Sequence, residues 1–163
     1  MGMGIRANTA SITKLKERIA ALSNSSSIVV GFEGDAKYPN GKSVGEVARY
    51  MEYGTPTIPP RPFMRLAMDA NRVKWISEVR DAILDSPDAG SLQRRLSKVG
   101  GEIVEAIQDS IDAVTVPPLA KSTIRARAAR GNGSQKPLVD TGKMRDSVAF
   151  KIGDYGAWQK SKA

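Results

Sequence analysis

Apolar residues recur at helical spacing in three stretches of the chain, and each stretch predicts an amphipathic helix. The first covers residues 11–22, the second precedes Ser86, and the third runs from Ser91 to about Ala113. Their apolar stripes are, in order, Ile12, Leu15, Ile19 and Leu22; Leu66, Ala70, Val73, Ile76, Val79 and Ile83; and Leu92, Leu96, Val99, Ile103, Ile107 and Ile111. Two short runs rich in β-branched residues, 27–32 and 147–152, predict strands.

The segments between these elements carry turn, cap and breaker signals. Ser43 and Glu46 have the spacing of a capping box, which starts a short helix that ends near Gly54 at a positive φ. Residues 53–63 contain four prolines and predict a stiff, non-helical strap. The pair Gly100 and Gly101 falls within the third helix and indicates either close approach of another backbone or a kink. Residues 34–42 and 136–143 predict turns, and residues 122–130 predict a basic helical segment.

This order of elements predicts an α+β fold, in which two long helices and shorter ones pack against a small mixed or antiparallel sheet. Two strands are few for a stable sheet within one subunit. We therefore expect a further strand, supplied by a loop of this chain or by another copy. The predicted domain covers residues 1–152, and residues 153–163 are expected to form a flexible tail.

Composition removes most catalytic chemistry from consideration. The 163 residues include no His and no Cys, which excludes His general bases, Cys nucleophiles, Cys/His zinc sites and disulfides. The carboxylate pairs Glu102/Glu105, Asp109/Asp112 and Asp81/Asp85 are spaced as on the solvated face of an amphipathic helix. The expectation is a protein that is not an enzyme and needs no cofactor or metal. No apolar run is long enough to span a membrane, so no membrane association is expected.

The positive charge is concentrated in the last third of the chain. Residues 115–163 hold 10 Lys and Arg against 3 Asp, a net charge of +7, whereas the whole chain carries +8. The predicted basic surface consists of Lys121, Arg125, Arg127 and Arg130. Such a surface attracts nucleic acid, an acidic protein face or an anionic membrane surface, and the alternative is a solvated arm that keeps the protein soluble.

Two motifs remain unexplained by core formation. The first is Glu52-Tyr-Gly-Thr followed by Ile58-Pro-Pro-Arg-Pro-Phe63. The second is Pro118-Leu-Ala-Lys-Ser-Thr123 followed by Lys136-Pro-Leu-Val-Asp-Thr-Gly-Lys-Met-Arg-Asp-Ser147. Together, in this order and over residues 27–152, they resemble the HK97-gp10-like and virion-morphogenesis families of tailed-phage neck and tail-completion proteins. Tyr53, Pro60 and Met144 stand where Phe, Ala and Leu are common in those families.

The resemblance implies a structural protein of the virion neck, made in the host cytoplasm, that assembles into a hexameric or dodecameric ring. The implied partners are further copies of the chain and neighbouring neck, portal-adaptor, tail-tube or tail-terminator proteins, with non-specific contact to packaged DNA. The assembly residues it implies are Glu52, Tyr53, Gly54, Arg61, Pro62 and Phe63, together with Asp140, Thr141 and Gly142.

The residue types allow more specific expectations for these positions. Arg61 could pair with Glu52, Phe63 is an apolar anchor, and Asp140 or Thr141 could cap the short segment that leads to Ser147. The alternative function is a basic, non-catalytic accessory protein that binds nucleic acid.

Overall fold

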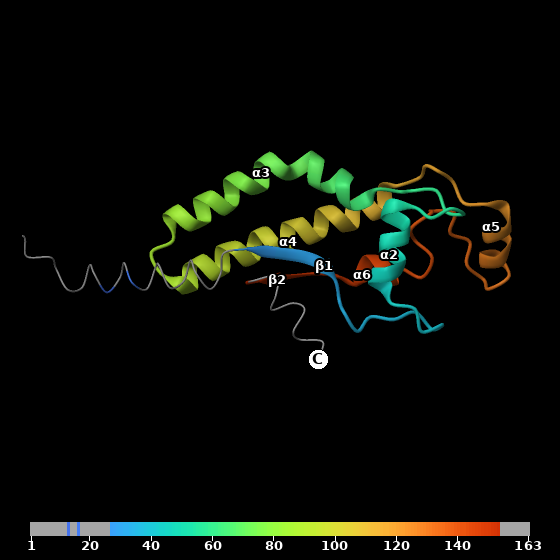
Figure 1. Cartoon of the computed structure of the whole chain (residues 1–163), viewed down its shortest axis with the longest axis horizontal. Helices are drawn as coiled ribbons and strands as arrows, with labels where there is room; N and C mark the ends of the chain where they lie inside the picture. Colours follow the sequence, from blue (N-terminus) through green and yellow to red (C-terminus); the bar gives the residue numbers. More distant parts are fainter. Residues whose placement is uncertain (1–12, 14–15, 17–26, 154–163) are drawn as a thin grey trace, which may run out of the picture.

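The computed structural model describes residues 13, 16 and 27–153. Within that part of the chain the elements are, in order, β1 (Ile28–Phe32), α2 (Val44–Tyr53), α3 (Phe63–Asp85), α4 (Ala89–Ala113), α5 (Lys121–Ala128), α6 (Lys143–Asp146) and β2 (Val148–Ile152) (Figure 1). The helix predicted at residues 11–22 lies outside the described residues except for Thr13 and Lys16, which are both helical. The predicted tail lies outside them except for Gly153.

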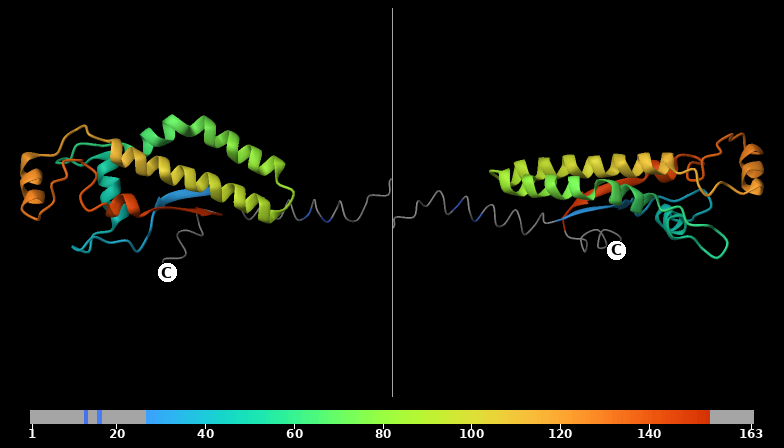
Figure 2. Two further views of the ribbon diagram at one scale, coloured as in Figure 1. Left: turned by 180° about the vertical axis from the view of Figure 1, so that it is seen from behind. Right: turned by 90° about the horizontal axis from the view of Figure 1, so that it is seen from above.

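The fold is α+β, as the order of elements predicts. β1 and β2 form an antiparallel sheet in which Ile28 lies opposite Ile152 and Phe32 lies opposite Val148. The two long helices α3 and α4 run side by side, and the sheet lies against α4 (Figure 2). The described residues form no third strand in this sheet, so each strand has one outer edge that pairs with nothing there.

α4 follows its sequence pattern closely. All six residues of its predicted stripe are buried, and its N-terminus is closed by a capping box between Asp88 and Ser91. The Ser91 amide donates to the Asp88 carboxylate at 2.8 Å. The helix continues through Gly100, where a Cβ would come within 2.3 Å of the Phe150 ring. Close approach is therefore confirmed, but the neighbouring group is an aromatic side chain of β2 and not another backbone.

The stripe predicted for α3 is wrong in its first four residues, whereas its last two, Val79 and Ile83, are partly buried and pack against the core. Its buried residues are Phe63, Ala67, Trp75 and Ala82, whereas Leu66, Val73 and Ile76 are exposed. The physical reason is that α3 carries apolar residues around its whole circumference, so that spacing alone does not select one face. Ala67 and Trp75 belong to the larger core cluster, and Ala82 belongs to a second cluster with Leu92 and Leu96 of α4.

α2 begins directly after Ser43 and ends at Gly54, as predicted, but the predicted capping box at its start does not form. Ser43 occupies the N-cap position, yet its hydroxyl makes no capping hydrogen bond to any described residue. Ser43 instead forms an isolated bridge with Lys37, and Glu46 accepts a hydrogen bond from the Tyr50 hydroxyl one turn further on. The predicted capping box is therefore wrong: the Ser43 hydroxyl does not cap the helix, and the Glu46 carboxylate is hydrogen-bonded to Tyr50 instead of the Ser43 amide.

Candidate functional site

The first motif begins at the end of α2, where Glu52 is buried over the start of α3. Its carboxylate accepts hydrogen bonds from the backbone amides of Met64 and Arg65 at 2.9 and 3.2 Å, and from Nε of Arg65 at 3.0 Å. The N-cap position of α3 is Pro62, which has no side-chain acceptor, so Glu52 serves as the capping carboxylate from another helix. The prediction that Arg61 pairs with Glu52 is wrong. The Arg65 guanidinium pairs with Glu52 because it belongs to the helix turn that Glu52 caps.

Gly54 and the strap form a closed turn between α2 and α3. Gly54 has φ 77°, and the amide of Thr55 donates to the carbonyl of Ile58 at 2.8 Å. A Cβ on Gly54 would lie 2.9 Å from that carbonyl oxygen and 3.0 Å from the Pro60 ring. The positive φ expected from the sequence is confirmed. The turn requires glycine both because of this positive φ and because a Cβ would collide with Ile58 and Pro60.

Arg61 joins the first motif to the second. Its side chain is buried, with Nε donating to the carbonyl of Pro117 at 2.8 Å and Nη2 to the carbonyl of Pro118 at 3.1 Å. Its own amide donates to the Met51 carbonyl at 2.7 Å. Burial lowers the pKa of Arg61 from its ordinary value, and the positive charge of Arg127 lowers it further. The guanidinium remains charged at neutral pH, because an Arg pKa begins so far above it.

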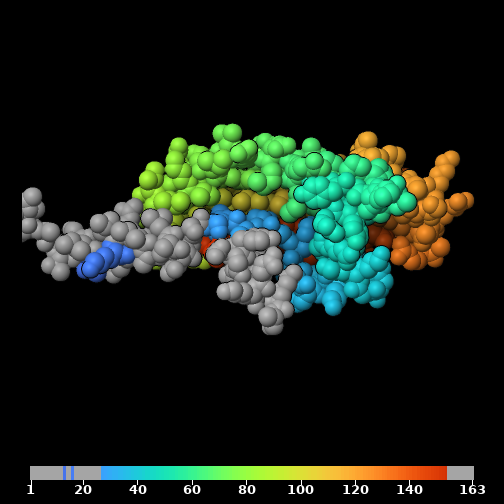
Figure 3. Space-filling view, viewed as in Figure 1, coloured from blue at the N-terminus to red at the C-terminus, as the bar shows by residue number. Residues whose placement is uncertain are grey.

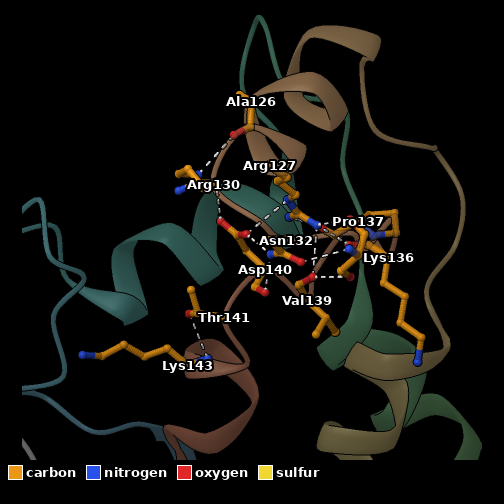
Figure 4. Close-up of polar contacts among 11 residues, drawn as sticks. Ala126, Arg127, Arg130, Asn132, Lys136, Pro137, Val139, Asp140, Thr141 and Lys143 are labelled. Carbon is orange, nitrogen blue, oxygen red and sulfur yellow. Dashed lines mark hydrogen bonds and ion pairs between the residues drawn. The ribbon is translucent and has the colours of Figure 1, made fainter.

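Arg127 is an internal residue of the second motif region and not part of its surface. It is 6% exposed. Its Nη1 donates to the carbonyls of Ser134, Lys136 and Val139 at 3.3, 2.8 and 3.0 Å (Figure 4). Five donors in a fixed planar fork suit a guanidinium to hold one loop through several carbonyls. The prediction that Arg127 belongs to a basic surface is corrected by this burial.

Asp140 is the anionic centre of the same loop. Its carboxylate accepts from Nη2 of Arg130 at 3.1 Å and from the Asn132 side-chain amide at 2.6 Å. The N-cap position of α6 is Gly142, with φ 80°, and the hydroxyl of Thr141 accepts a long hydrogen bond of 3.4 Å from the amide of Lys143, the first residue of the helix. Of the two predicted capping residues, Thr141 therefore contacts the helix N-terminus, whereas the Asp140 carboxylate is turned toward Arg127, Arg130 and Asn132.

The two motifs meet at a cleft of about 320 Å³. One wall is formed by α2 and the strap residue Ile58, and the other by residues 137–144, which include Asp140, Thr141 and Gly142. Tyr38, from the loop after β1, also lines the cleft. Burial raises the pKa of Tyr38 above its ordinary value, and the charge of Asp140 adds to the shift. The phenol is therefore a neutral hydrogen-bonding group at physiological pH.

The remaining predicted site residues are arranged around this framework. Tyr53 is 68% exposed, and its ring lies beneath the Arg65 guanidinium at 5.4 Å from the centroid. Phe63 is fully buried in the core, against the edge of Phe32. Lys121 and Arg125 are exposed on α5, which lies at one end of the elongated molecule (Figure 1). Within the first motif, therefore, the buried residues Glu52, Arg61 and Phe63 stabilise the fold, whereas Tyr53 is accessible to a partner.

Four of the six carboxylates singled out in the sequence, Glu102, Asp112, Asp81 and Asp85, lie in ion pairs. Glu102 accepts from Lys74 at 2.8 Å, and Asp112 accepts from Arg145 at 2.9 Å. The described residues contain no group of three His, Cys, Asp or Glu side chains placed to hold a metal ion. None of the helices formed by these residues is both long and apolar enough to cross a membrane.

Sequence reasoning missed Arg65 and Asn132, which orient Glu52 and Asp140. The available signal for Arg65 was its position in the first turn of α3, close to the buried carboxylate. Nothing in the sequence around Asn132 distinguishes it from other polar loop residues.

Comparisons of the chain with models of protein families, with curated proteins and with solved structures gave no match in any of the three.

Proposed function

We propose that this protein is a non-enzymatic structural subunit of the tailed-phage head–tail junction, which assembles into a ring and helps to join tail to head. The observation that supports the proposal is that the two family-like motifs contact each other and share one cleft. Arg61 bonds two carbonyls at the start of the second motif, and Ile58 shares a cleft with Asp140 and Thr141. Segments some 60 to 80 residues apart in sequence thereby form one surface.

This surface has the properties that assembly requires. Its buried charged groups, Glu52, Arg61 and Arg127, are each held by three or more hydrogen bonds or ion pairs. A surface held in this way loses little conformational entropy when a partner binds, which favours repeated association of identical copies. Tyr53, which follows Glu52 in the sequence, is 68% exposed, and tyrosine is one of the residues enriched among energetically important contacts.

The small sheet supplies a second means of association. β1 and β2 each pair with one strand, and among the described residues their outer edges pair with none. An unpaired edge can accept a strand from another chain through main-chain hydrogen bonds. In the proposed ring, a neighbouring copy completes the sheet, and the other partners are the neck, portal-adaptor and tail-tube or tail-terminator proteins of the virion.

The alternative, a nucleic-acid-binding accessory protein, rests on the basic last third of the chain. The net charge of that third already counts Asp140, the partner of Arg130, so only the pairing of Arg145 with Asp112 reduces it further. The exposed Lys121 and Arg125, together with exposed lysines such as Lys136 and Lys143, remain for non-specific contact with packaged DNA. In the proposed role, binding of the isolated protein to free duplex is weak, independent of sequence and steeply dependent on salt.

The test uses variants of exposed residues in a phage that depends on this protein. Tyr53→Ala and Thr141→Arg alter the proposed surface, and Gln93→Arg is a matched control on the exposed face of α4. Exposed substitutions change stability by only about 0.5 kcal/mol, so all three variants should fold, which circular dichroism checks. We expect the two surface variants to leave unjoined heads and tails in electron micrographs, and the control to give intact particles.

Wild-type infectivity with both surface variants would contradict the proposed surface. Absence of the protein from purified particles would contradict the proposed function. Tight, sequence-specific duplex binding by the monomer, abolished by Lys121→Glu and Arg125→Glu, would instead favour the accessory protein.

A further inference from the structure

The cleft between α2 and residues 137–144 carries polar groups that have no partner among the described residues. Lys42 and Lys143 line it, and neither side chain forms a hydrogen bond or ion pair with another described residue. The Tyr38 hydroxyl also lines the cleft and makes no hydrogen bond to that part of the chain. The Asp140 carboxylate does not serve these donors, because Arg and Asn side chains of its own subunit already hold it. The cleft therefore offers three hydrogen-bond donors, two of them positively charged.

Between these donors the walls of the cleft are apolar. They are formed by Val47, Met51, Ile58, Leu138 and Met144. The volume of about 320 Å³ is roughly twice that of a cavity that holds one benzene molecule, about 150 Å³, so the cleft has room for about two side chains. An occupant that presents carboxylates beside apolar side chains matches both the donors and the walls.

The C-terminal half of α4 belongs to a surface of this kind. Residues 99–113 contain four acidic residues and no basic residue. Glu105 and Asp109, one turn apart on α4, are exposed and form no ion pair with a described residue. Asp109 borders a surface hollow together with Leu66 and Val116, which are 53% and 74% exposed. We call Leu66, Glu105, Asp109 and Val116 the acidic face.

We propose that the cleft of one copy binds the acidic face of the next copy, with Glu105 and Asp109 near Lys42 and Lys143 and Val116 against the apolar walls. The contact rests on the ring proposed above and names its two surfaces. Two chains of net charge +8 repel each other, so a contact between copies requires faces of opposite local charge. Lys143, which is exposed in the single subunit, is then covered in the ring.

The two surfaces lie on different parts of the molecule. The cleft and the hollow have no lining residue in common. In the space-filling view α2, which forms one wall of the cleft, lies on the near surface, whereas α4 is mostly hidden behind α3 and β1 (Figure 3). A contact between two different patches is heterologous, which is the type of contact that closes into rings.

Two single-cysteine chains test the contact, because the parent chain has no cysteine. One full chain carries Thr141→Cys at the cleft, and the other carries Val116→Cys on the acidic face. The two purified chains differ in mass by a tag. They are mixed and treated with a short bis-maleimide linker, and mass spectrometry gives the protein concentration at which half of the maximal heterodimer is linked. Gln93→Cys replaces Val116→Cys in a control mixture and should give no linked heterodimer.

Charge reversal then tests which groups meet. Lys42→Glu with Lys143→Glu reverses the cleft, and Glu105→Lys with Asp109→Lys reverses the acidic face. We expect either reversal alone to raise the half-maximal concentration about tenfold, equivalent to about 1.4 kcal/mol. Mixing the reversed cleft with the reversed acidic face should restore the parent value, because the charges are again opposite.

A matched control places the same charge change at the other end of α3, as Asp81→Lys with Asp85→Lys, and should link like the parent. Equal linking in the parent and in either reversed mixture, or no recovery when both faces are reversed, would overturn the proposal. Absence of linked heterodimer in the parent mixture up to about 1 mM would overturn it as well. Particles that still contain a ring of this protein would then leave the proposed function intact, with the copies joined through other surfaces.

Discussion

Gly100 lies in the middle of α4 at the point where the Phe150 ring crosses the helix. A Cβ at this position would come within 2.3, 2.6 and 2.7 Å of three ring carbons, compared with about 3.5–4.0 Å for an ordinary carbon contact. Phe150 is held in β2 opposite Val30, so the ring must move by about 1 Å against the pairing of the sheet. Overpacking of this kind costs up to about 3 kcal/mol.

The substitution Gly100→Ala therefore combines two opposed effects. Ala is more favourable than Gly in a helix interior by about 1 kcal/mol. The expected net result is destabilisation by about 2 kcal/mol, taking the upper end of the overpacking range because three ring atoms collide. At the neighbouring Gly101, an added Cβ would meet no other part of the described protein within 4 Å, so Gly101→Ala should stabilise the protein by up to about 1 kcal/mol.

Urea unfolding followed by circular dichroism measures both variants. With a slope of about 2 kcal/mol per molar urea, their midpoints should differ by about 1.5 M. Phe150→Leu in the Gly100→Ala background should recover part of the loss, because it removes the colliding ring. A Gly100→Ala variant as stable as the parent would refute the packing of Phe150 on α4.

Three further predictions concern buried and capping polar groups. Arg61→Lys should destabilise the protein by about 2–4 kcal/mol in urea unfolding, because a single ammonium cannot satisfy both proline carbonyls, whereas the exposed control Arg49→Lys should change stability by less than about 0.5 kcal/mol. Asp88→Ala should cost about 1 kcal/mol through loss of the α4 cap, and Asp88→Asn should restore most of it; equal losses in both would contradict the capping role. The hydrogen bond from Lys74 lowers the pKa of Glu102, so this contribution is present above the ordinary carboxyl pKa and is lost as pH falls through the lowered value. The stability difference between the parent and Lys74→Met should therefore shrink as the pH falls from above the ordinary carboxyl pKa through the lowered pKa, and a difference that grows in acid would contradict the pairing.

The parts of the fold that sequence predicts well are those with one dominant pattern. α4 has a single stripe, so its buried face follows from spacing alone. α3 has apolar residues on all sides, and the choice of Trp75 over Ile76 for the interior depends on the shape of α4 and the sheet. One local backbone signal is also confirmed, since the positive φ of Gly54 follows from its place at a helix end, whereas the capping box at Ser43 does not form.

Charged residues near the site were harder to predict because their partners are set by tertiary structure. Glu52 and Arg61 are close in sequence and opposite in charge, yet Glu52 caps α3 while Arg61 reaches the carbonyls of Pro117 and Pro118. Arg127 contributes to the net charge of the last third, but its side chain is buried and donates hydrogen bonds to backbone carbonyl groups. Composition counts such charges without indicating which of them reach the surface.

The measurement that tests the proposed function most directly is electron cryomicroscopy of particles purified from the host that makes this protein, with the copies per particle counted. We predict a closed ring of six or twelve copies between head and tail, in which the surface around Tyr53 and Thr141 contacts a neighbouring subunit. Particles that join head to tail without this protein, or that hold it as scattered single copies, would contradict the proposed function.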